Sequence, residues 1–315
     1  MKKILIDCDP GIDDSLALIL ALKSDQVDLR AVTTVSGNLH VDDTSRNALT
    51  IMEMMGADSI PVAKGMAKPL VRDIPFDPFS HGKDGLGNTG LPQPKRSLAP
   101  VFGPDLIVEQ ANLYPGELTL IALGPLSNIA MALLKDPELP KKVKELVCIG
   151  GAFGFNEYAY KHATGDNPVS EWNVYVDPEA AKMVFNSGLS IRAVGLDVAT
   201  HPDINFPQEQ VDLLRQSSNQ EAVYVSKLVD FVEGRGFQSY CVLIDSLAVA
   251  AVIDPSVIET TSVRVDVETA GTLTRGQTVC DTRNHFRWDH LPVIDAASGA
   301  DFRKFSEIVT SALLK

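Results

Sequence analysis

The chain has little cysteine, a deficit of positive charge and no long apolar run. Its four cysteines (Cys8, Cys148, Cys241 and Cys280) lie far apart and form no CxxC pair, which argues against a disulfide framework or a zinc site and favours a reducing compartment. Charges or prolines interrupt the longest apolar stretches, so we expect no membrane-spanning segment. With 28 basic against 41 acidic residues and no basic patch interleaved with aromatic residues, nucleic acid is not an expected partner.

The length and composition fit one large α/β domain. The 315 residues, 45% of them hydrophobic, can bury a large core, and neither a linker nor an internal repeat interrupts them. We therefore expect a single domain over residues 1–315. The start, Met-Lys-Lys-Ile-Leu-Ile-Asp, resembles a signal peptide only briefly, because Asp7 and Asp9 interrupt its apolar part. We expect a cytoplasmic protein that begins with a strand.

Apolar strands alternate with helices along most of the chain, which predicts an open, mostly parallel central sheet with flanking helices, a Rossmann-like α/β fold. From Val263 onward the pattern changes to short alternating strands with Gly271 and Gly276 at turns, so we expect a small antiparallel addition near the C-terminus. Expected strands cover 4–6, 27–35, 61–63, 118–123, 146–149 and 191–196, and expected helices cover 42–55, 129–134, 178–185, 221–232 and 302–313.

Two long segments, 66–100 and 152–172, have no regular pattern and are rich in Gly, Pro, Asn and His. Loops of this length in a compact domain are usually functional or mobile. Several strands also end in polar or glycine-rich turns, such as Ser36-Gly37-Asn38 and Gly150-Gly151. The carboxyl ends of parallel strands meet at one edge of a sheet, so these turns predict a pocket there.

Four aspartates crowd the end of the first strand and the start of the following helix: Asp7, Asp9, Asp13 and Asp14. Carboxylates this close repel one another unless a cation lies among them. A hard divalent ion with oxygen ligands satisfies that requirement. The alternative interpretation is that one or two of the aspartates only cap the helix and shape the turn.

The run Asp-Cys-Asp-Pro-Gly-Ile-Asp-Asp at 7–14 resembles the DxDPGxDD signature of the inosine–uridine-preferring nucleoside hydrolases. Further segments resemble the motifs of that family in the same order along most of the chain. They are Val-Ser-Gly-Asn at 35–38, His-Gly and Asp-Gly-Leu within 81–86, Leu-Gly-Pro-Leu-Ser-Asn at 123–128, Gly-Gly-Ala at 150–152, Glu-Trp-Asn-Val at 171–174 and Asp-Pro-Glu-Ala-Ala at 177–181.

The resemblance implies calcium-dependent hydrolysis of the N-glycosidic bond of ribonucleosides, which gives ribose and free nucleobase for purine or pyrimidine salvage. It also implies a homodimer or homotetramer. Carried over by position, the Ca²⁺ ligands would be the carboxylates of Asp9, Asp14 and Asp245 and the backbone carbonyl of Leu123.

The same resemblance assigns roles around the sugar. Asp13 would be the general base that activates the attacking water, and Asn38, Glu171 and Asn173 would bind the ribose hydroxyls. His81, in a matched loop, is a candidate for the part of the pocket that binds the base.

Two positions depart from the family pattern. Many members have a histidine before the late metal-binding aspartate, where it is implicated in protonating the leaving group, but this chain has Ile244 there. The family's ribose-binding asparagine falls on Gly165, and Asp166 or Asn167 could replace it only if the loop path shifts.

Other residues could supply the missing proton. The nearest candidates are His81 and Tyr240, followed by Arg235 or a water held near the pocket mouth. One of the histidines in irregular stretches, His162, His285 or His290, could also approach the pocket mouth. Trp172, between two expected pocket residues on an extended stretch, would point away from the pocket by strand alternation.

Two other functions remain open on the sequence alone. A magnesium-dependent phosphohydrolase also begins with an apolar strand and Asp-x-Asp, although Gly11 stands where that class has Thr or Val. A ribose- or nucleoside-binding protein with the same fold and little catalysis is the second, because Ile244 removes an expected acid.

Overall fold

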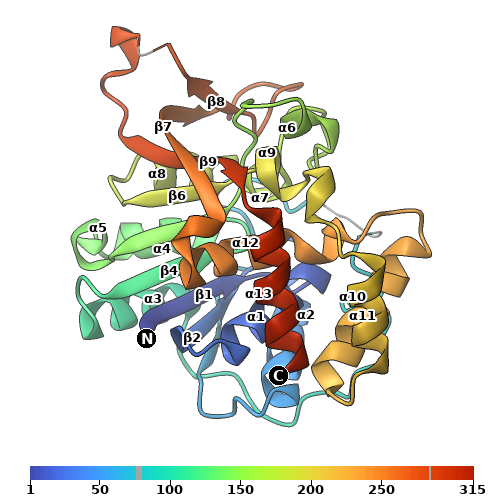
Figure 1. The fold of residues 1–315 in the computed structure, drawn as a ribbon. Helices are drawn as coiled ribbons and strands as arrows, with labels where there is room; N and C mark the ends of the chain where they lie inside the picture. The colour runs from blue at the N-terminus through green and yellow to red at the C-terminus, as the bar shows by residue number, and fades with distance from the viewer. Residues whose placement is uncertain (76–79, 284) are drawn as a thin grey trace.

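The computed structural model describes residues 1–75, 80–283 and 285–315. Within these residues, nine strands form one sheet in the order β3-β2-β1-β4-β5-β6-β9-β7-β8 (Figure 1). The strands are β1 (Lys2–Cys8), β2 (Val27–Thr34), β3 (Val62–Lys64), β4 (Leu118–Ala122), β5 (Glu145–Ile149), β6 (Ile191–Val194), β7 (Ile258–Val267), β8 (Thr278–Asp281) and β9 (Val293–Ala300).

Helices connect the strands and cover the sheet. They are α1 (Ile12–Lys23), α2 (Val41–Met54), α3 (Gly103–Leu113), α4 (Ser127–Lys135), α5 (Leu139–Lys142), α6 (Tyr158–Lys161), α7 (Trp172–Val176), α8 (Pro178–Phe185), α9 (Leu196–Ala199), α10 (Gln208–Gln216), α11 (Gln220–Glu233), α12 (Tyr240–Ile253) and α13 (Phe302–Leu314), with 3₁₀ turns η1 (Pro202–Ile204), η2 (Pro255–Val257) and η3 (Phe286–Trp288). In the described part of the chain, no helix combines the length and apolar character needed to cross a membrane.

The sheet confirms the expected fold class. Strands β1 to β6 and β9 pair in parallel, while β7 pairs antiparallel with both β8 and β9 and extends the sheet at its C-terminal end. One expectation needs correction, because the segment 152–172 is not wholly irregular: it contains the short helix α6.

Two hydrophobic layers pack on opposite faces of the sheet, as the strand sequences require. In β1, Ile4 and Ile6 join the cluster beneath α1, α2, α11, α12 and α13, while the intervening Leu5 joins the cluster beneath α3, α4 and α8. Successive side chains of a strand point to opposite faces, so a run of consecutive apolar residues makes a strand that is buried on both sides. The result is a three-layer α/β/α sandwich (Figure 1).

The strand order reverses direction at β1, which lies between β2 and β4. In open α/β sheets, ligands bind outside the carboxyl ends of the strands at such a switch point. Asp9 follows β1 and Leu123 follows β4, and the two strands pair up to Asp7 and Ala122. The fold therefore places the aspartate motif and the Leu123 turn together at the expected binding crevice.

Candidate active site

The turn between β1 and α1 is built around the carboxylate of Asp14. Its Oδ1 accepts a hydrogen bond from the backbone N–H of Asp9 at 3.0 Å, and its Oδ2 accepts one from Gly11 at 3.0 Å. These bonds satisfy N–H groups near the start of α1 that have no partner within the helix. Asp14 therefore caps the helix, as the alternative interpretation of the motif expected, and still belongs to the acidic cluster described next.

Asp13, Asp14 and Asp245 bring carboxylate oxygens to within 4.8 Å of one another. Asp245 lies in the second turn of α12 and reaches the cluster because α12 packs along α1. Asp9 stands outside this tight group but adjoins it through its hydrogen bond to Asp14. The structure thus gathers Asp9, Asp13, Asp14 and Asp245. The three carboxylates that lie closest together include Asp13, whereas the set of ligands implied by the resemblance includes Asp9 in its place.

The cluster is buried and short of positive charge. Asp9 Oδ1 and Asp13 Oδ1 are buried and have no hydrogen-bond partner among the described residues. Within those residues no lysine or arginine pairs with the cluster, and His81 Nδ1 approaches Asp13 Oδ1 only to 3.8 Å. Burial, followed by repulsion from the neighbouring carboxylates, raises the pKa of Asp9, Asp13 and Asp245 well above the ordinary value. Such a set of oxygens fits a hard divalent cation.

Asp7, the first aspartate of the motif, has a different environment. Its Oδ1 accepts hydrogen bonds from Thr33 Oγ1 at 2.6 Å and Asn128 Nδ2 at 2.7 Å, so it ties β1 to β2 and to the start of α4. Burial raises the pKa of Asp7 to about 7, although these two bonds oppose the shift. It does not line the cavity described below.

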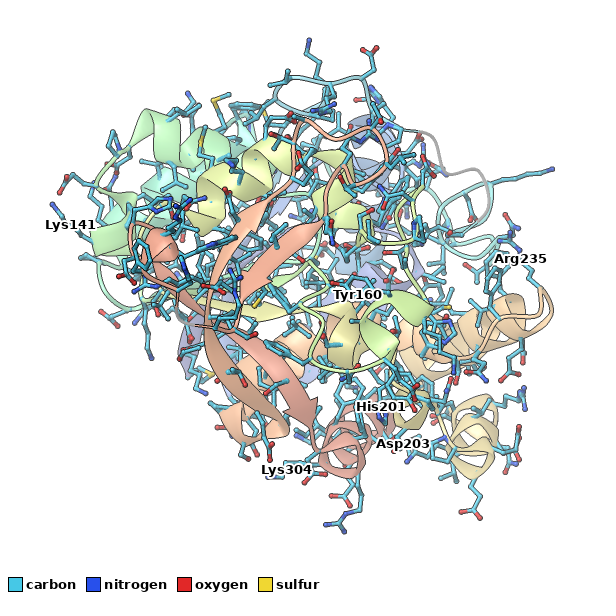
Figure 2. The ribbon with its side chains drawn as sticks, turned by 90° about the horizontal axis from the view of Figure 1, so that it is seen from above. Lys141, Tyr160, His201, Asp203, Arg235 and Lys304 are labelled. Atoms are coloured by element: carbon cyan, nitrogen blue, oxygen red, sulfur yellow. The ribbon has the colours of Figure 1, made fainter. Side chains whose placement is uncertain are left out.

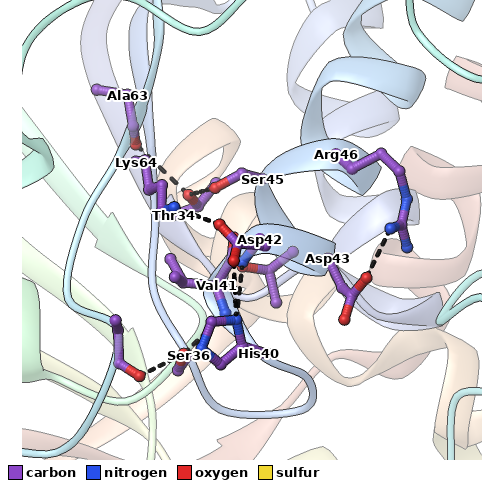
Figure 3. Close-up of polar contacts among 12 residues, drawn as sticks. Thr34, Ser36, His40, Val41, Asp42, Asp43, Ser45, Arg46, Ala63 and Lys64 are labelled. Carbon is purple, nitrogen blue, oxygen red and sulfur yellow. Dashed lines mark hydrogen bonds and ion pairs between the residues drawn. The ribbon is translucent and has the colours of Figure 1, made fainter.

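Asn38 comes from the turn between β2 and α2 and joins the acidic cluster. Its backbone N–H donates to Asp9 Oδ2 at 2.6 Å, and its Nδ2 donates to Asp14 Oδ2 at 3.2 Å. The turn is fixed on both sides of Asn38: Ser36 Oγ donates to the Ala67 carbonyl and accepts from Val41 N–H (Figure 3). The local sequence therefore holds Asn38 rigidly beside the aspartates.

Glu171 and Asn173 stand on the other wall, at the start of α7. Glu171 caps this helix by accepting from the N–H groups of Asn173 and Val174, and it also accepts from Gly151 N–H at 3.2 Å. Burial raises the pKa of Glu171 to about 7 against the opposing effect of these bonds. Asn173 Nδ2 donates to the Leu123 carbonyl at 2.6 Å. The expected ribose contacts and the expected carbonyl ligand are therefore neighbours.

His81 lies against the start of α1. Its Nδ1 accepts the backbone N–H of Ile12 at 3.2 Å. The ring is largely buried and packs on Gly11, where a β-carbon would lie 2.3 Å from Nδ1. The structure thus places His81 in the pocket, as expected, on the side of Asp13.

These walls enclose a cavity of about 480 Å³ at the carboxyl edge of the sheet. Seven of the nine residues expected from the sequence line it: Asp13, Asn38, His81, Leu123, Glu171, Asn173 and Asp245. The other two, Asp9 and Asp14, do not line it, and both accept hydrogen bonds from Asn38. Other lining residues come from two stretches of the chain, one from the end of α6 to the start of α7 and the other from the segment after α11 into α12. They include Lys161, His162, Thr164, Trp172, Phe237, Tyr240, Cys241 and Ile244.

The sequence missed several members of this second group. Thr164 lines the cavity and its Oγ1 accepts from Trp172 N–H at 2.8 Å, whereas Asn167 bonds to the Arg275 carbonyl and is not among the lining residues. The only signal for Thr164 was its position in a long irregular segment. Neither Asp166 nor Asn167 therefore takes the place of the family asparagine at Gly165.

The extended conformation expected for Trp172 is wrong. Trp172 begins helix α7 instead of lying on an extended stretch, so strand alternation does not apply. The residue is among those that line the cavity, and its ring stacks on that of Tyr175 with 6.1 Å between centroids. Tyr224, by contrast, is buried in the core with its hydroxyl hydrogen-bonded to Ser15 Oγ at 3.1 Å. Arg235 is exposed at the molecular periphery, with its guanidinium over the rings of Phe231 and Phe237 (Figure 2). Neither Tyr224 nor Arg235 lines the cavity.

Comparison with known proteins places this chain among the hydrolases that act on N-glycosyl compounds. The family model described as inosine-uridine preferring nucleoside hydrolase matches residues 4–307. The chain belongs to the inosine-uridine preferring nucleoside hydrolase family and is an enzyme of that class.

Individual relatives agree with this assignment. The chain is 38% identical to probable uridine nucleosidase 2 of Arabidopsis thaliana, over 100% of this chain and 98% of the relative. It is also 38% identical to an inosine-uridine preferring nucleoside hydrolase of Leishmania major, over 90% and 88%. A solved plant nucleoside hydrolase covers 99% of both chains with a TM-score of 0.89 and 31% identity. The family and these relatives favour nucleoside hydrolysis over the phosphohydrolase interpretation.

Proposed function

We propose that this enzyme hydrolyses the N-glycosidic bond of ribonucleosides with a Ca²⁺ ion held by Asp9, Asp14, Asp245 and the Leu123 carbonyl. The observation that carries the proposal is the buried acidic cluster, which has no balancing lysine or arginine in the described part of the chain and adjoins a cavity. A cation of charge +2 would restore the balance and accept the unpaired oxygen of Asp9 as a ligand. A backbone carbonyl has two lone pairs, so Leu123 can serve while it accepts from Asn173.

Asp13 is the proposed general base. Its Oδ1 has no hydrogen-bond partner among the described residues and belongs to a side chain that lines the cavity, so it can receive a proton from the attacking water. Burial raises the pKa of Asp13 in the metal-free protein, whereas a bound cation beside it would favour the ionised carboxylate, the form that accepts a proton. When bound, Ca²⁺ would polarise that water and contact sugar hydroxyls.

The remaining polar residues fit a ribose. Asn38, Glu171 and Asn173 all line the cavity from two facing turns, and each has amide or carboxylate atoms that can bond to hydroxyl groups. The transition state of glycosidic cleavage carries positive charge on the sugar, and the nearby carboxylates stabilise that charge. His81 packs beside Asp13 and is proposed as a further substrate contact.

A panel of nucleosides tests this function. The relatives named above and a purine-preferring ribonucleoside hydrolase of Gardnerella vaginalis, which has a TM-score of 0.87 and 28% identity over 99% of this chain and 98% of its own, indicate that both purine and pyrimidine ribosides belong in the panel. We expect free ribose to be released and to disappear after treatment with a chelator. Tight nucleoside binding without ribose release would instead support a binding protein, and phosphate release from phosphoesters would support a phosphohydrolase.

The quaternary structure proposed with this function is a homodimer or homotetramer. Light scattering coupled to size-exclusion chromatography measures it directly, and a monomer would contradict it.

A further inference from the structure

The structure confirms that the cavity has no acid at residue 244. Ile244 lines it, and an isoleucine cannot donate a proton. When the bond between the sugar and the base breaks, the nucleobase leaves with an electron pair that a proton must neutralise unless the base is a good leaving group. Without an acid at residue 244, the proton has to come from another group that reaches the same part of the cavity.

Tyr240 and Ile244 mark this part of the cavity. They are four residues apart on α12, so they lie on the same face of the helix, and both line the cavity. The ring of His162 lies against Tyr240, with 5.6 Å between ring centroids and an angle of 46° between the planes. His162, which directly follows α6, therefore reaches the face of α12 that carries Ile244, the position at which relatives have the acid.

The imidazole of His162 is half-buried and available to a ligand. It lines the cavity, and among the described residues its contact is with Tyr240, without a hydrogen bond or an ion pair. The backbone N–H of His162 bonds to the Tyr160 carbonyl at the end of α6, which holds the residue at the helix terminus.

The loop that leads to His162 is anchored. Asp197, at the start of α9, accepts hydrogen bonds from the N–H groups of Phe153 at 2.8 Å and Phe155 at 2.7 Å, and its backbone carbonyl accepts from Asn156 Nδ2. The ring of Tyr158 in α6 also packs edge-on against the ring of His201, with 4.7 Å between the ring centroids. His201 is labelled in Figure 2. These contacts give the loop a defined path toward the cavity.

The other titratable groups nearby are less suited to proton donation. Burial raises the pKa of the Tyr240 phenol further above its already high ordinary value, and raises the pKa of the Cys241 thiol to about 11, so both are weak acids. The Lys161 ammonium lies over the Tyr158 ring at 5.4 Å. Imidazole is the side chain that exchanges protons most readily near neutral pH.

We propose that His162 is the catalytic residue that protonates the departing nucleobase, and that Tyr240 positions its ring. This inference rests on the proposed nucleoside hydrolysis. In the step, the bond between C1′ and the base nitrogen breaks and its electron pair goes to the base, which takes a proton from the His162 imidazolium. The water oxygen bonds to C1′ while one water proton goes to Asp13. Proton exchange with solvent then restores His162 and Asp13.

The test compares two kinds of substrate in His162→Ala. Inosine and uridine have leaving groups that need a proton, whereas p-nitrophenyl riboside has one that leaves without it. We expect kcat with the natural nucleosides to fall by about 10²-fold or more, and the rate with p-nitrophenyl riboside to stay within about threefold of the wild type on the same reasoning. His290→Ala, an exposed histidine away from the cavity, is the matched control and should leave both rates unchanged.

Tyr240→Phe separates the two members of the pair. It keeps the ring that contacts His162 and removes only the hydroxyl, so we expect the preference between substrates to stay close to that of the wild type. Equal slowing of both substrates in His162→Ala would overturn the proposal, as would a selective loss in Tyr240→Phe or His81→Ala with none in His162→Ala. If the wild-type protein with Ca²⁺ released ribose from none of these substrates, the proposed function would fail instead.

Discussion

The imidazole of His81 rests directly on the backbone of Gly11. Its Nδ1 accepts the N–H of Ile12 at 3.2 Å, and a β-carbon at Gly11 would come within 2.3 Å of the same atom. Glycine is therefore required at position 11 by close approach of a side chain, in the turn that also holds the acidic cluster. The Pro-Gly pair that ends β1 thus also makes room for a pocket residue.

Substituting Gly11 by alanine should displace His81 and lower activity. We expect kcat/KM for a natural nucleoside to fall by about 10²-fold, because displacing a group near the reacting atoms by about 1 Å has that effect. The check is a double-mutant cycle with His81→Ala, which removes the clashing ring. Gly11→Ala should cost little further activity in that background, and full additivity of the two effects would show that the close contact is irrelevant.

Removal of the metal should abolish turnover. We expect about one Ca²⁺ per chain by metal analysis and a loss of ribose release after chelation that added Ca²⁺ reverses. Asp245→Asn should weaken Ca²⁺ binding, whereas Asp254→Asn, at the other end of α12 and outside the cluster, should bind like the wild type. Protein without a bound divalent ion whose activity is indifferent to chelator would refute the metal site.

Asp13→Asn should slow catalysis and spare the metal. An amide cannot take a proton from water, so we expect turnover to fall by about 10²- to 10⁴-fold, the usual effect of losing a positioned base. Calcium content measured on the same sample decides the role of the residue. Near-normal turnover would remove Asp13 from the mechanism, and a variant without calcium would identify it chiefly as a ligand, as its place in the group with Asp14 and Asp245 would allow.

The pH dependence of stability should change in Glu171→Gln. Burial raises the pKa of this carboxyl group from 4.5 to about 7 in the folded metal-free protein. Between these pH values the folded state holds a proton that the unfolded state has lost, so the stabilising contribution is complete below pH 4.5 and declines as the pH rises to about 7. Glutamine does not titrate, so this decline should be absent from the variant.

Urea unfolding of the chelated wild type and of Glu171→Gln at several pH values measures this effect. The free energy of unfolding of the variant, relative to the wild type, should rise by up to about 3 kcal/mol between pH 4.5 and 7. Glutamine places an amide group opposite the N–H donors of Gly151, Asn173 and Val174, which lowers the stability of the variant by the same amount at every pH. Comparing how the free energy of unfolding changes with pH in the two proteins removes this constant difference. Parallel curves for the two proteins would show that Glu171 titrates normally.

Much of the fold and part of the site follow from local sequence. Continuous apolar runs such as Ile4 to Ile6 make strands buried on both faces, and their alternation with helices makes a parallel sheet whose carboxyl ends share an edge. This reasoning alone predicts that Asp9, Asn38 and Leu123 meet, because each follows a strand directly. The family motifs added Glu171, Asn173 and Asp245, which the structure also brings to this edge.

Only the tertiary structure decided which atoms face one another across the cavity. The packing of α12 along α1 brings Asp245 to Asp13, and the anchored loop before α7 brings His162 to Tyr240. Periodicity describes the faces of one element, and it holds no information about how distant elements pack or how an irregular loop is tethered. The sequence by itself therefore determined the sheet and the acidic end of the pocket, while long-range packing determined the residues opposite, because their positions depend on contacts between segments far apart in the chain.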